Sequence, residues 1–322
     1  MKKVYLIISI DTECDKDSKW EIPQPMRFDN IFEQQIMLFP LFKKYRIKPT
    51  YLLSPEVLKD ENSVNFFQEN IGWIELGTHL HVEFIAPNEN MTSTNTNDIQ
   101  RNCKKEVEFE KLKNLTNLFE AKFGFQPTSF RSGRFGSSDY TTSILSELGY
   151  KVDSSIVPFT TKVFKNHRID SWGKSVIPYW ETFKDKRLLQ VPLTLMNSGY
   201  DKLPAILKRG IGKPNSLTKK ITAKLGFSLK TEWLRPYRKD TKELIEIADY
   251  VINNSFKKSD FAILNIMFHS NEILPAASPY CKTPLEVESF IKSLDELFNY
   301  ICQNHELCAI GLSDLHEVYN QS

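Results

Sequence analysis

The stretch Trp73-Ile-Glu-Leu-Gly-Thr-His79-Leu-His81 joins a short, largely apolar run to two histidines that are one residue apart. The run predicts a β-strand, and alternate side chains of a strand lie on the same face. His79 and His81 therefore project together at the carboxyl end of the strand. This arrangement is typical of a metal site, although a lone His-x-His pair also occurs as one buried and one solvated histidine. Further ligands have to come from elsewhere in the chain.

Two other strand ends carry side chains that can bind a metal or move protons. The first apolar run ends in Asp11-Thr-Glu13, and a late one ends in His269. Asp11 and Glu13 are two residues apart, so both carboxylates face the same region as the paired histidines. Two carboxylates this close need a cation, and one carboxylate with two histidines is a common catalytic zinc arrangement. The sequence therefore predicts one divalent metal ion, with Zn²⁺ favoured, and a second carboxylate free to act as a base.

Short buried-strand runs recur along the chain, and an amphipathic segment follows each of them. This alternation predicts a βα architecture with a parallel sheet. About eight such strands favour a closed or nearly closed (β/α) barrel. We therefore expect one α/β domain over residues 1–322. The expected strands are Val4–Ile10, Pro49–Leu53, Trp73–Leu76, Thr128–Phe130, Lys151–Ser154, Leu188–Val191, Ala262–Phe268 and Leu307–Leu312.

Three helices have recognisable end signals. Residues 240–243 (Asp-Thr-Lys-Glu) and 283–286 (Thr-Pro-Leu-Glu) are capping boxes, and the second has proline at the first helical position. A long, charged amphipathic helix is expected over residues 98–122, with Gly124 placed to end it.

The overall composition excludes several classes of protein. The 322 residues are 41% hydrophobic and 25% charged, which favours a globular domain with a substantial core over disorder. Lys and Arg number 42 against 40 Asp and Glu, so the net charge of +2 indicates no particular partner. The five cysteines form no Cys-x-x-Cys pair, which favours a reducing compartment. The first apolar run is too short for a signal peptide, so a cytoplasmic protein is expected.

One segment departs from the barrel pattern. Residues 202–239 hold eleven Lys or Arg against a single acid, Glu232, and include Trp233-Leu-Arg235-Pro. This basic insertion is either a solvated, lysine-rich loop or a surface for anionic phosphate or lipid headgroups, which would allow peripheral membrane contact. Few aromatic residues lie between its basic residues, so no nucleic acid partner is indicated.

Five motifs, in order along nearly the whole chain, resemble those of the polysaccharide deacetylase family, which includes the nodulation-factor deacetylases. They are Ser9-Ile-Asp11-Thr-Glu13, Glu75-Leu-Gly77-Thr-His79, Phe130-Arg131-Ser-Gly133-Arg-Phe-Gly136, Tyr150-Lys-Val-Asp153 and Asn265-Ile-Met-Phe-His269. The third motif is similar to the version found in bacterial surface-polysaccharide enzymes. Each motif is a weak signal alone, but their common order is specific. The resemblance implies a distorted (β/α) barrel with about seven or eight parallel strands.

The resemblance also implies roles for the site residues. Asp11 would be the catalytic base, and Arg131 would hold it in place. Glu13 would be a metal ligand. His269 would be the general acid, and Asp153 would tune that histidine.

The third metal ligand is open between two residues. The resemblance implies that Glu13 and His79 bind the metal together with one more side chain. The family's usual element is His-x-x-x-His, and here Glu83 stands where the second histidine is expected. Strand geometry favours His81 as the third ligand, whereas a turn of helix would favour Glu83.

The implied activity is metal-dependent hydrolysis of an acetyl group, with N-acetyl favoured, on a sugar. In the cytoplasm the substrate would be a lipid-linked or nucleotide-linked saccharide used to build a surface polysaccharide. A metal-dependent amidase acting on a non-sugar C–N bond would use the same residues and stays open. A catalytically inactive barrel that binds saccharide is a third possibility, but such a chain is expected to lack a ligand or His269, and this sequence has them all.

Overall fold

The computed structural model describes residues 1–93, 95–204, 229–237 and 240–321, together with residues 208, 222 and 224. Its main sheet has nine strands. They are β1 (Lys3–Thr12), β2 (Thr50–Leu53), β3 (Glu75–Leu80), β4 (Ser129–Ser132), β5 (Val152–Asp153), β8 (Tyr179–Phe183), β9 (Lys186–Gln190), β12 (Phe261–His269) and β13 (Glu306–Ala309). Two small sheets accompany it, formed by β6 (Thr161–Val163) with β7 (Arg168–Asp170), and by β10 (Leu195–Met196) with β11 (Glu232–Trp233).

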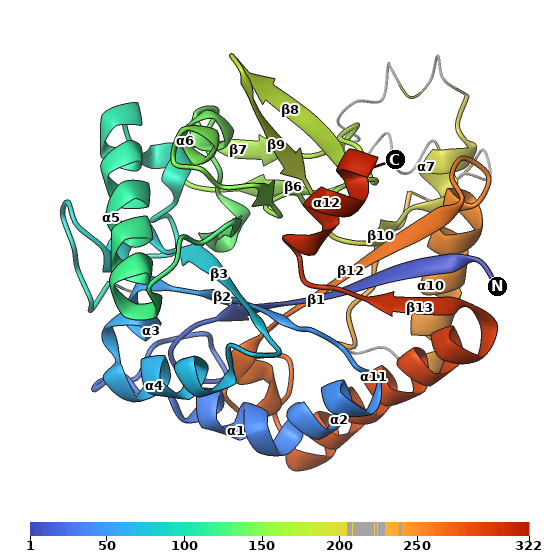
Figure 1. The fold of residues 1–322 in the computed structure, drawn as a ribbon, viewed down its shortest axis with the longest axis horizontal. Helices are drawn as coiled ribbons and strands as arrows, with labels where there is room; N and C mark the ends of the chain where they lie inside the picture. Colours follow the sequence, from blue (N-terminus) through green and yellow to red (C-terminus); the bar gives the residue numbers. More distant parts are fainter. Residues whose placement is uncertain are drawn as a thin grey trace.

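The main sheet runs in the order β12-β1-β2-β3-β4-β5-β9-β8, with β13 paired to the first half of β1 (Figure 1). Its pairings are parallel except the one between β8 and β9. All eight strands expected from the sequence are present, and the α/β fold with about eight parallel strands is confirmed. The additional strand, β8, is a partly exposed edge strand, and such a strand lacks the continuous apolar run by which buried strands are recognised.

The sheet curves so that its two ends approach each other. Backbone pairing among the described residues does not join β8 or β9 to β12. Instead Thr194, which follows β9, donates its backbone N–H to the carbonyl oxygen of Asn265 in β12 at 3.1 Å, and the N–H of Asn265 reaches Oγ1 of Thr194 at 2.7 Å. These contacts produce a distorted, incompletely paired barrel.

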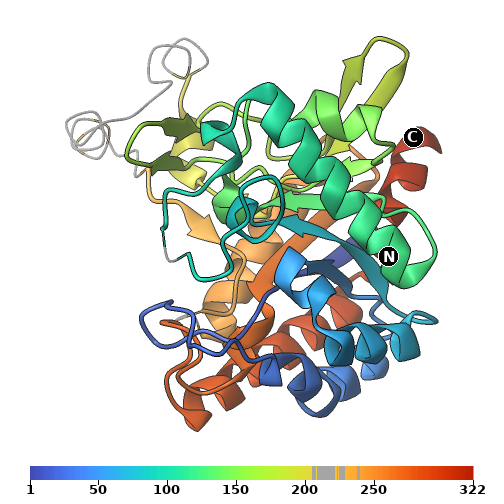
Figure 2. The ribbon, with the colours of Figure 1, turned by 90° about the vertical axis from the view of Figure 1, so that its left-hand side faces the viewer.

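Most of the helices cover the outer face of the sheet. The helices are α1 (Asp29–Met37), α2 (Phe39–Lys44), α3 (Pro55–Lys59), α4 (Glu61–Asn70), α5 (Lys105–Phe123), α6 (Thr141–Glu147), α7 (Ser198–Lys202), α10 (Thr241–Ser255), α11 (Pro284–Asn304) and α12 (Asp314–Gln321). Helices α1, α2 and α11 lie together along the lower side of the sheet in both ribbon views (Figures 1 and 2). Both expected capping boxes are present, at the starts of α10 and α11.

Helix α5 begins later than expected. Residues 100–102 form a separate 3₁₀ turn, and the backbone of Cys103 and Lys104 is extended, so the helix starts at Lys105 rather than near residue 98. It ends where expected, because Gly124 takes a left-handed conformation with φ 76°. Glycine adopts this conformation without the steric cost that a Cβ atom brings.

The side chains of β1 alternate between the two faces of the sheet, which explains where its polar residues lie. Leu6 and Ile8 belong to the large core beneath the helices, whereas Ile7 packs inside the curved sheet against Leu315 of α12. Ser9 and Asp11 follow Ile7 on this inner face because alternate residues of a strand share a face. The inside of the barrel is therefore apolar near the start of β1 and polar near its end.

The basic segment 202–239 lies largely outside the described residues. Where it is described, Leu229, Leu234 and Arg235 are buried and Trp233 belongs to β11, whereas Lys202 and Lys230 are exposed. Leu234 and Arg235 therefore pack into the protein, and contact of the basic segment with a membrane stays a prediction.

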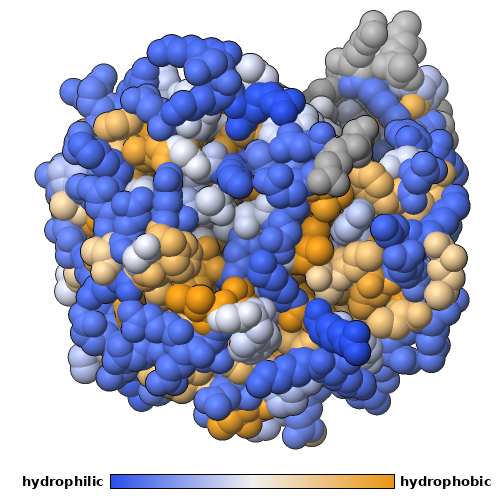
Figure 3. All heavy atoms as spheres, viewed as in Figure 1, coloured by the Kyte–Doolittle hydropathy of each residue, from blue (hydrophilic) through white to orange (hydrophobic). Residues whose placement is uncertain are grey.

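On the face of the molecule that Figure 3 shows, hydrophilic residues predominate and apolar patches lie between them. Among the helices of the described part of the chain, none has both the length and the apolar character needed to cross a bilayer.

A substitution at Gly77 of β3 tests how tightly this strand packs against its neighbours in the sheet. A Cβ atom at this position would lie 2.5 Å from the backbone oxygen of Ser129 in β4 and 2.7 Å from Cδ2 of Leu52 in β2. We therefore expect Gly77→Ala to lower the free energy of unfolding by about 1–3 kcal/mol, measured by urea denaturation. Gly72→Ala is the matched control, because its Cβ would meet nothing within 4 Å. Equal stability of the two variants would contradict the packing described here.

Candidate metal centre and active site

Three buried side chains from the ends of β1 and β3, which β2 separates in the sheet, meet at its carboxyl edge. Glu13 follows β1, His79 lies near the end of β3, and His81 follows that strand directly. Oε1 of Glu13 lies 3.2 Å from Nε2 of His79 and 3.1 Å from Nε2 of His81. One ligand atom from each residue falls within 4.8 Å of the others, which is the clustering that a single metal ion requires.

The hydrogen bonds of the two imidazoles show that these atoms suit a cation. Nδ1 of His79 lies 3.0 Å from the carbonyl oxygen of Arg131, which can only accept, so Nδ1 carries the proton and Nε2 has a free lone pair. Burial lowers the pKa of His79 to about 4, which keeps the ring neutral. Lone pairs of two imidazoles and a carboxylate therefore point at one another. Such a donor set fits Zn²⁺ or a similar divalent ion.

Glu83 takes a different position from the three converging residues. Its Oε1 lies 3.2 Å from Nδ1 of His81, on the far side of the ring from Glu13, and 2.7 Å from Nη2 of Arg134. Burial alone would raise the pKa of Glu83, but His81 and Arg134 outweigh it and hold the pKa well below its usual range. Nη1 of Arg134 also lies 3.2 Å from Nδ1 of His81. When Nδ1 carries the proton and donates to the ionised Glu83, Nε2 is free. In the structure Glu83 thus orients His81 and does not face the ligand cluster.

Lys16 was not expected at this centre. Its side chain is buried and its ammonium forms an ion pair with Oε2 of Glu13, the oxygen that does not face the histidines. The ammonium also lies 4.6 Å from the ring centre of Trp20. Burial lowers the pKa of Lys16 to about 7. The pairing leaves Oε1 as the oxygen of Glu13 that points to His79 and His81.

Asp11 is held by a fully buried arginine. Nη1 of Arg131 lies 2.5 Å from Oδ1 of Asp11, and the other guanidinium nitrogens donate to Ser9 and Ser154 at 2.7–2.9 Å. Burial by itself would raise the pKa of Asp11, but Arg131 and the nearby histidines lower it to about 2. Asp11 is therefore ionised, and its other oxygen, Oδ2, faces Nε2 of His79 at 3.9 Å.

His269 completes the group from the end of β12. Its Nε2 lies 4.0 Å from both Oδ2 of Asp11 and Oε1 of Glu13, and its Nδ1 lies 3.0 Å from Oε1 of Glu272. Burial lowers the pKa of His269 to about 4, although the Glu272 carboxylate opposes this shift. Arg235 pairs with the same oxygen of Glu272. Nη2 of Arg235 also lies 3.3 Å from Nδ1 of His269. When Nδ1 carries the proton and donates to Glu272, the lone pair of Nε2 points to the centre.

The carboxylate beside His269 is therefore not the expected one. Asp153 lies on β5, where its Oδ1 accepts the N–H of Ser155 at 2.9 Å and its Oδ2 accepts Nε2–H of Gln190 at 3.2 Å. The contact with His269 that was expected of Asp153 is made in the structure by Glu272. The physical reason is local: the 3₁₀ turn that follows β12 folds Glu272 back over His269, three residues earlier.

Aromatic rings form a wall beside His269. The Trp20 ring lies 4.8 Å from the His269 ring, edge to face, and the Tyr280 ring lies 5.4 Å from Trp20. The guanidinium of Arg235 lies 4.4 Å from the Tyr280 ring. These apolar surfaces limit the access of water to the imidazole.

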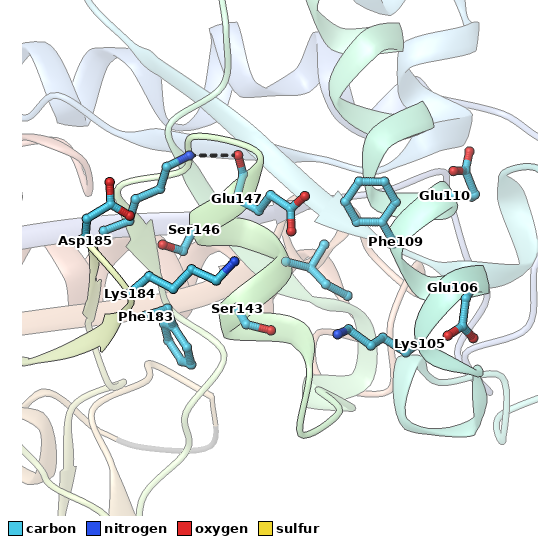
Figure 4. A pocket seen from close by; sticks show the side chains of 12 residues that line it. Lys105, Glu106, Phe109, Glu110, Ser143, Ser146, Glu147, Phe183, Lys184 and Asp185 are labelled. Carbon is cyan, nitrogen blue, oxygen red and sulfur yellow. Dashed lines mark hydrogen bonds between the residues drawn. The ribbon is translucent and has the colours of Figure 1, made fainter.

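A wider groove of about 790 Å³ lies elsewhere, between α5, α6 and the tip of the β8–β9 hairpin (Figure 4). Phe109, Ile144 and Phe183 line it, together with charged side chains such as Glu147 and Lys184. Its lining includes no histidine or cysteine. The chemistry available around Glu13, His79 and His81 is therefore not available in this groove.

The structure brings together six of the seven predicted site residues and adds others that the sequence did not reveal. Asp11, Glu13, His79, His81, Arg131 and His269 converge, and Asp153 lies apart from His269. The additional residues at the centre are Lys16, Arg134, Arg235 and Glu272. One signal was present in the sequence: Glu272 follows His269 by three residues, the spacing of a capping box.

Comparison with solved structures identifies the fold. No protein-family model and no curated protein matches the chain. The structure is similar to a protein described as a polysaccharide deacetylase from Mycobacterium smegmatis, with a TM-score of 0.56 and 13% identity over 99% of this chain and 91% of that one. A polysaccharide deacetylase structure from Pseudomonas aeruginosa PAO1 matches with a TM-score of 0.56 and 10% identity over 99% and 91% of the two chains. The structure of the Puue allantoinase matches with a TM-score of 0.57 and 11% identity over 99% of this chain and 90% of that one.

The chain therefore has the polysaccharide deacetylase fold, as the sequence motifs predicted. An allantoinase shares this fold, so the fold alone does not identify the reaction.

Metal content distinguishes ligands from the residues that orient them. We expect the purified protein to bind about one divalent ion per chain, and Glu13→Gln or His79→Ala to lose most of it, because each removes a convergent donor. Glu83→Gln should keep the ion with about 10- to 100-fold weaker affinity, since it only loosens His81. Elemental analysis and competition with a chelator measure both effects. If Glu83→Gln lost the metal ion completely and His81→Gln kept it, Glu83 rather than His81 would be the third ligand.

The pKa of His269 shows which of two carboxylates, Glu272 or Asp153, tunes this histidine. Glu272→Gln removes the negative charge that stabilises the imidazolium, so we expect the pKa of His269 to fall below about 4 in the metal-free variant. Asp153→Asn should leave this pKa unchanged. Titration of the imidazole resonances by NMR measures the shift. A fall in the Asp153 variant alone would restore the role first predicted for that residue.

Proposed function

We propose that the protein is a metal-dependent hydrolase that removes an acetyl group, as the N-acetyl amide, from a saccharide. The observation that supports this most is the convergence of Glu13, His79 and His81 beside an arginine-held Asp11 and a free Nε2 of His269. The proposed ion is one Zn²⁺ held by these three ligands. When bound, it would polarise the acetyl carbonyl and lower the pKa of a coordinated water.

Asp11 is the proposed base. It is ionised at neutral pH, and Arg131 occupies Oδ1 only, so Oδ2 can take the proton of the attacking water. The ion pair also fixes the direction of Oδ2, because four hydrogen bonds hold the guanidinium. Arg131 is thus proposed as a positioning residue.

His269 is the proposed acid. Its low pKa means that it rests neutral, and Oδ2 of Asp11 lies 4.0 Å from its Nε2. We infer that the proton taken up by Asp11 passes to Nε2, and that the imidazolium gives it to the leaving amine. Glu272 stabilises the imidazolium while it carries the charge. The proton balance then closes within the site.

The proposed substrate is an acetylated saccharide carried on a lipid or a nucleotide during assembly of a surface polysaccharide. The similarity of the third motif to surface-polysaccharide enzymes supports this proposal. All five cysteines are free, which fits the reducing interior of a cell, and we propose a cytoplasmic location.

The similarity to an allantoinase structure supports a second candidate, an amidase that acts on a non-sugar C–N bond. The two candidates use the same ligands, base and acid. Acetate release from acetylated sugar nucleotides, lipid-linked saccharides and oligosaccharides separates them, because the amidase would leave every acetylated sugar intact while hydrolysing small amides.

Two single variants test the catalytic roles. Asp11→Asn and His269→Ala should stay folded and keep their metal, because neither residue is among the three convergent ligands. Each should lower kcat on the acetylated saccharide by about 10²- to 10⁴-fold, since each removes a proton-transfer group. The measurements are acetate release, elemental analysis and circular dichroism. Activity near that of the wild type in either folded, metal-loaded variant would contradict the mechanism.

A further inference from the structure

Lys162 is a cation beside the metal centre that pairs with none of the described carboxylates. It lies in β6, and its Nζ donates a hydrogen bond to the backbone oxygen of Arg134 at 3.2 Å and lies 4.0 Å from the ring centre of Phe135. Among the described residues, no carboxylate comes within ion-pair distance of this nitrogen. An ammonium has three N–H donors, so two of them remain available to a ligand.

The other cations around the centre are each paired with a carboxylate. The four pairs are Lys16–Glu13, Arg131–Asp11, Arg134–Glu83 and Arg235–Glu272. Their charges cancel pair by pair, and they leave no excess charge for a substrate to match. Lys162 and a bound divalent ion would therefore make the centre positive.

Two charged groups of the centre act on the Lys162 ammonium. Burial lowers the pKa of Lys162 to about 8, the Asp11 carboxylate opposes this shift, and the Arg235 guanidinium adds to it. Electrostatic effects weaken with distance, so the ammonium lies near both groups. Asp11 is the proposed base, and Arg235 holds the carboxylate that contacts the proposed acid. A substrate at the centre is therefore close to Lys162.

Lys162 is also accessible to a ligand. Its side chain is only partly buried and lines a cavity of about 330 Å³ between the β6–β7 hairpin and the ends of β5 and β9. Basic and acidic side chains both line this cavity, for example Arg168 and Asp170, so the cavity as a whole selects no charge. Lys162 differs from its exposed neighbour Arg168, because the Lys162 ammonium turns toward Arg134 and the centre.

A partly desolvated ammonium favours a negatively charged ligand over a neutral one. The Phe135 ring lies against the Lys162 ammonium and limits its hydration. Hydrogen bonds between two charged groups are about twice as strong as those between neutral groups. Lysine also binds carboxylate and phosphate as a point charge, without the fixed planar geometry of arginine.

We propose that Lys162 determines substrate specificity by binding an anionic oxygen group, a carboxylate or a phosphate, on the acetylated saccharide. The inference rests on the proposed function and narrows it: the substrate is an acidic or phosphate-bearing sugar. Carboxylate and phosphate offer the same chemistry to an ammonium, and the experiment below distinguishes them.

The test compares acetate release from three sugars that share the N-acetyl group. They are neutral N-acetylglucosamine, its phosphate ester and the corresponding uronic acid. We expect the wild type to have a higher kcat/KM for an anionic sugar than for the neutral one. Lys162→Met keeps the length of the side chain but removes its charge, so it should lower this preference roughly tenfold by raising KM. The anionic sugar that loses more in this variant identifies the group as carboxylate or phosphate.

Two further variants control for charge and for structure. Lys162→Arg keeps a positive charge and should retain most of the preference. Lys165→Met removes an exposed lysine of the same hairpin and should leave the preference unchanged. Elemental analysis should give the same metal content for all of these proteins. A merely structural role of Lys162 would instead lower kcat/KM by the same factor for neutral and anionic sugars.

Equal kcat/KM of the wild type for the neutral sugar and both anionic sugars would overturn the inference and leave the deacetylase proposal standing. So would an undiminished preference in folded Lys162→Met. Lys162→Gln, with the same expected loss, takes the place of Lys162→Met if that variant does not fold.

Binding decides the role of Lys162 if no sugar releases acetate, a result that would count against the proposed function. Isothermal titration calorimetry is then carried out on the metal-free protein, so that the phosphate cannot bind the ion. Tighter binding of an anionic sugar than of the neutral one, abolished by Lys162→Met, supports anion recognition. Equal binding of the three sugars, or a preference that the variant keeps, overturns it.

Discussion

The fully buried guanidinium of Arg131 is the constraint around which the polar end of the barrel is organised. A buried charge is tolerated only when it is paired and hydrogen-bonded throughout. Arg131 meets this requirement through Asp11, Ser9 and Ser154, which come from two other strands, and its own carbonyl oxygen fixes the tautomer of His79. One residue thus sets the ionisation of the proposed base through its side chain and the free lone pair of a proposed metal ligand through its backbone carbonyl.

The same design recurs around the other two imidazoles. Arg134 pairs with Glu83, which orients His81, and Arg235 pairs with Glu272, which orients His269. Each of the three imidazoles is therefore oriented by an acceptor at its Nδ1. For His81 and His269 the acceptor is a carboxylate paired with an arginine, and for His79 it is the backbone carbonyl of Arg131. Outer contacts of this kind fix ring orientation and basicity, and they commonly affect activity nearly as much as the ligands do.

The site chemistry and the fold carry different information. The deacetylase and allantoinase structures share this barrel with the chain at 10–13% identity. The barrel therefore provides an edge at which strand ends meet, but it does not determine the substrate. Specificity then depends on the neighbouring loops.

The sequence by itself determined the eight expected strands, the caps of α10 and α11 and the meeting of Glu13 with His79, because strand periodicity and capping chemistry are local. It did not reveal the exposed edge strand β8, which lacks an apolar run. It could not place Arg235, because a basic stretch is expected to be solvated unless a buried partner, here Glu272, is known. Only the tertiary structure showed that His81 rather than Glu83 lies against Glu13, and that Glu272 rather than Asp153 lies against His269, because these contacts depend on how the fold brings distant segments together.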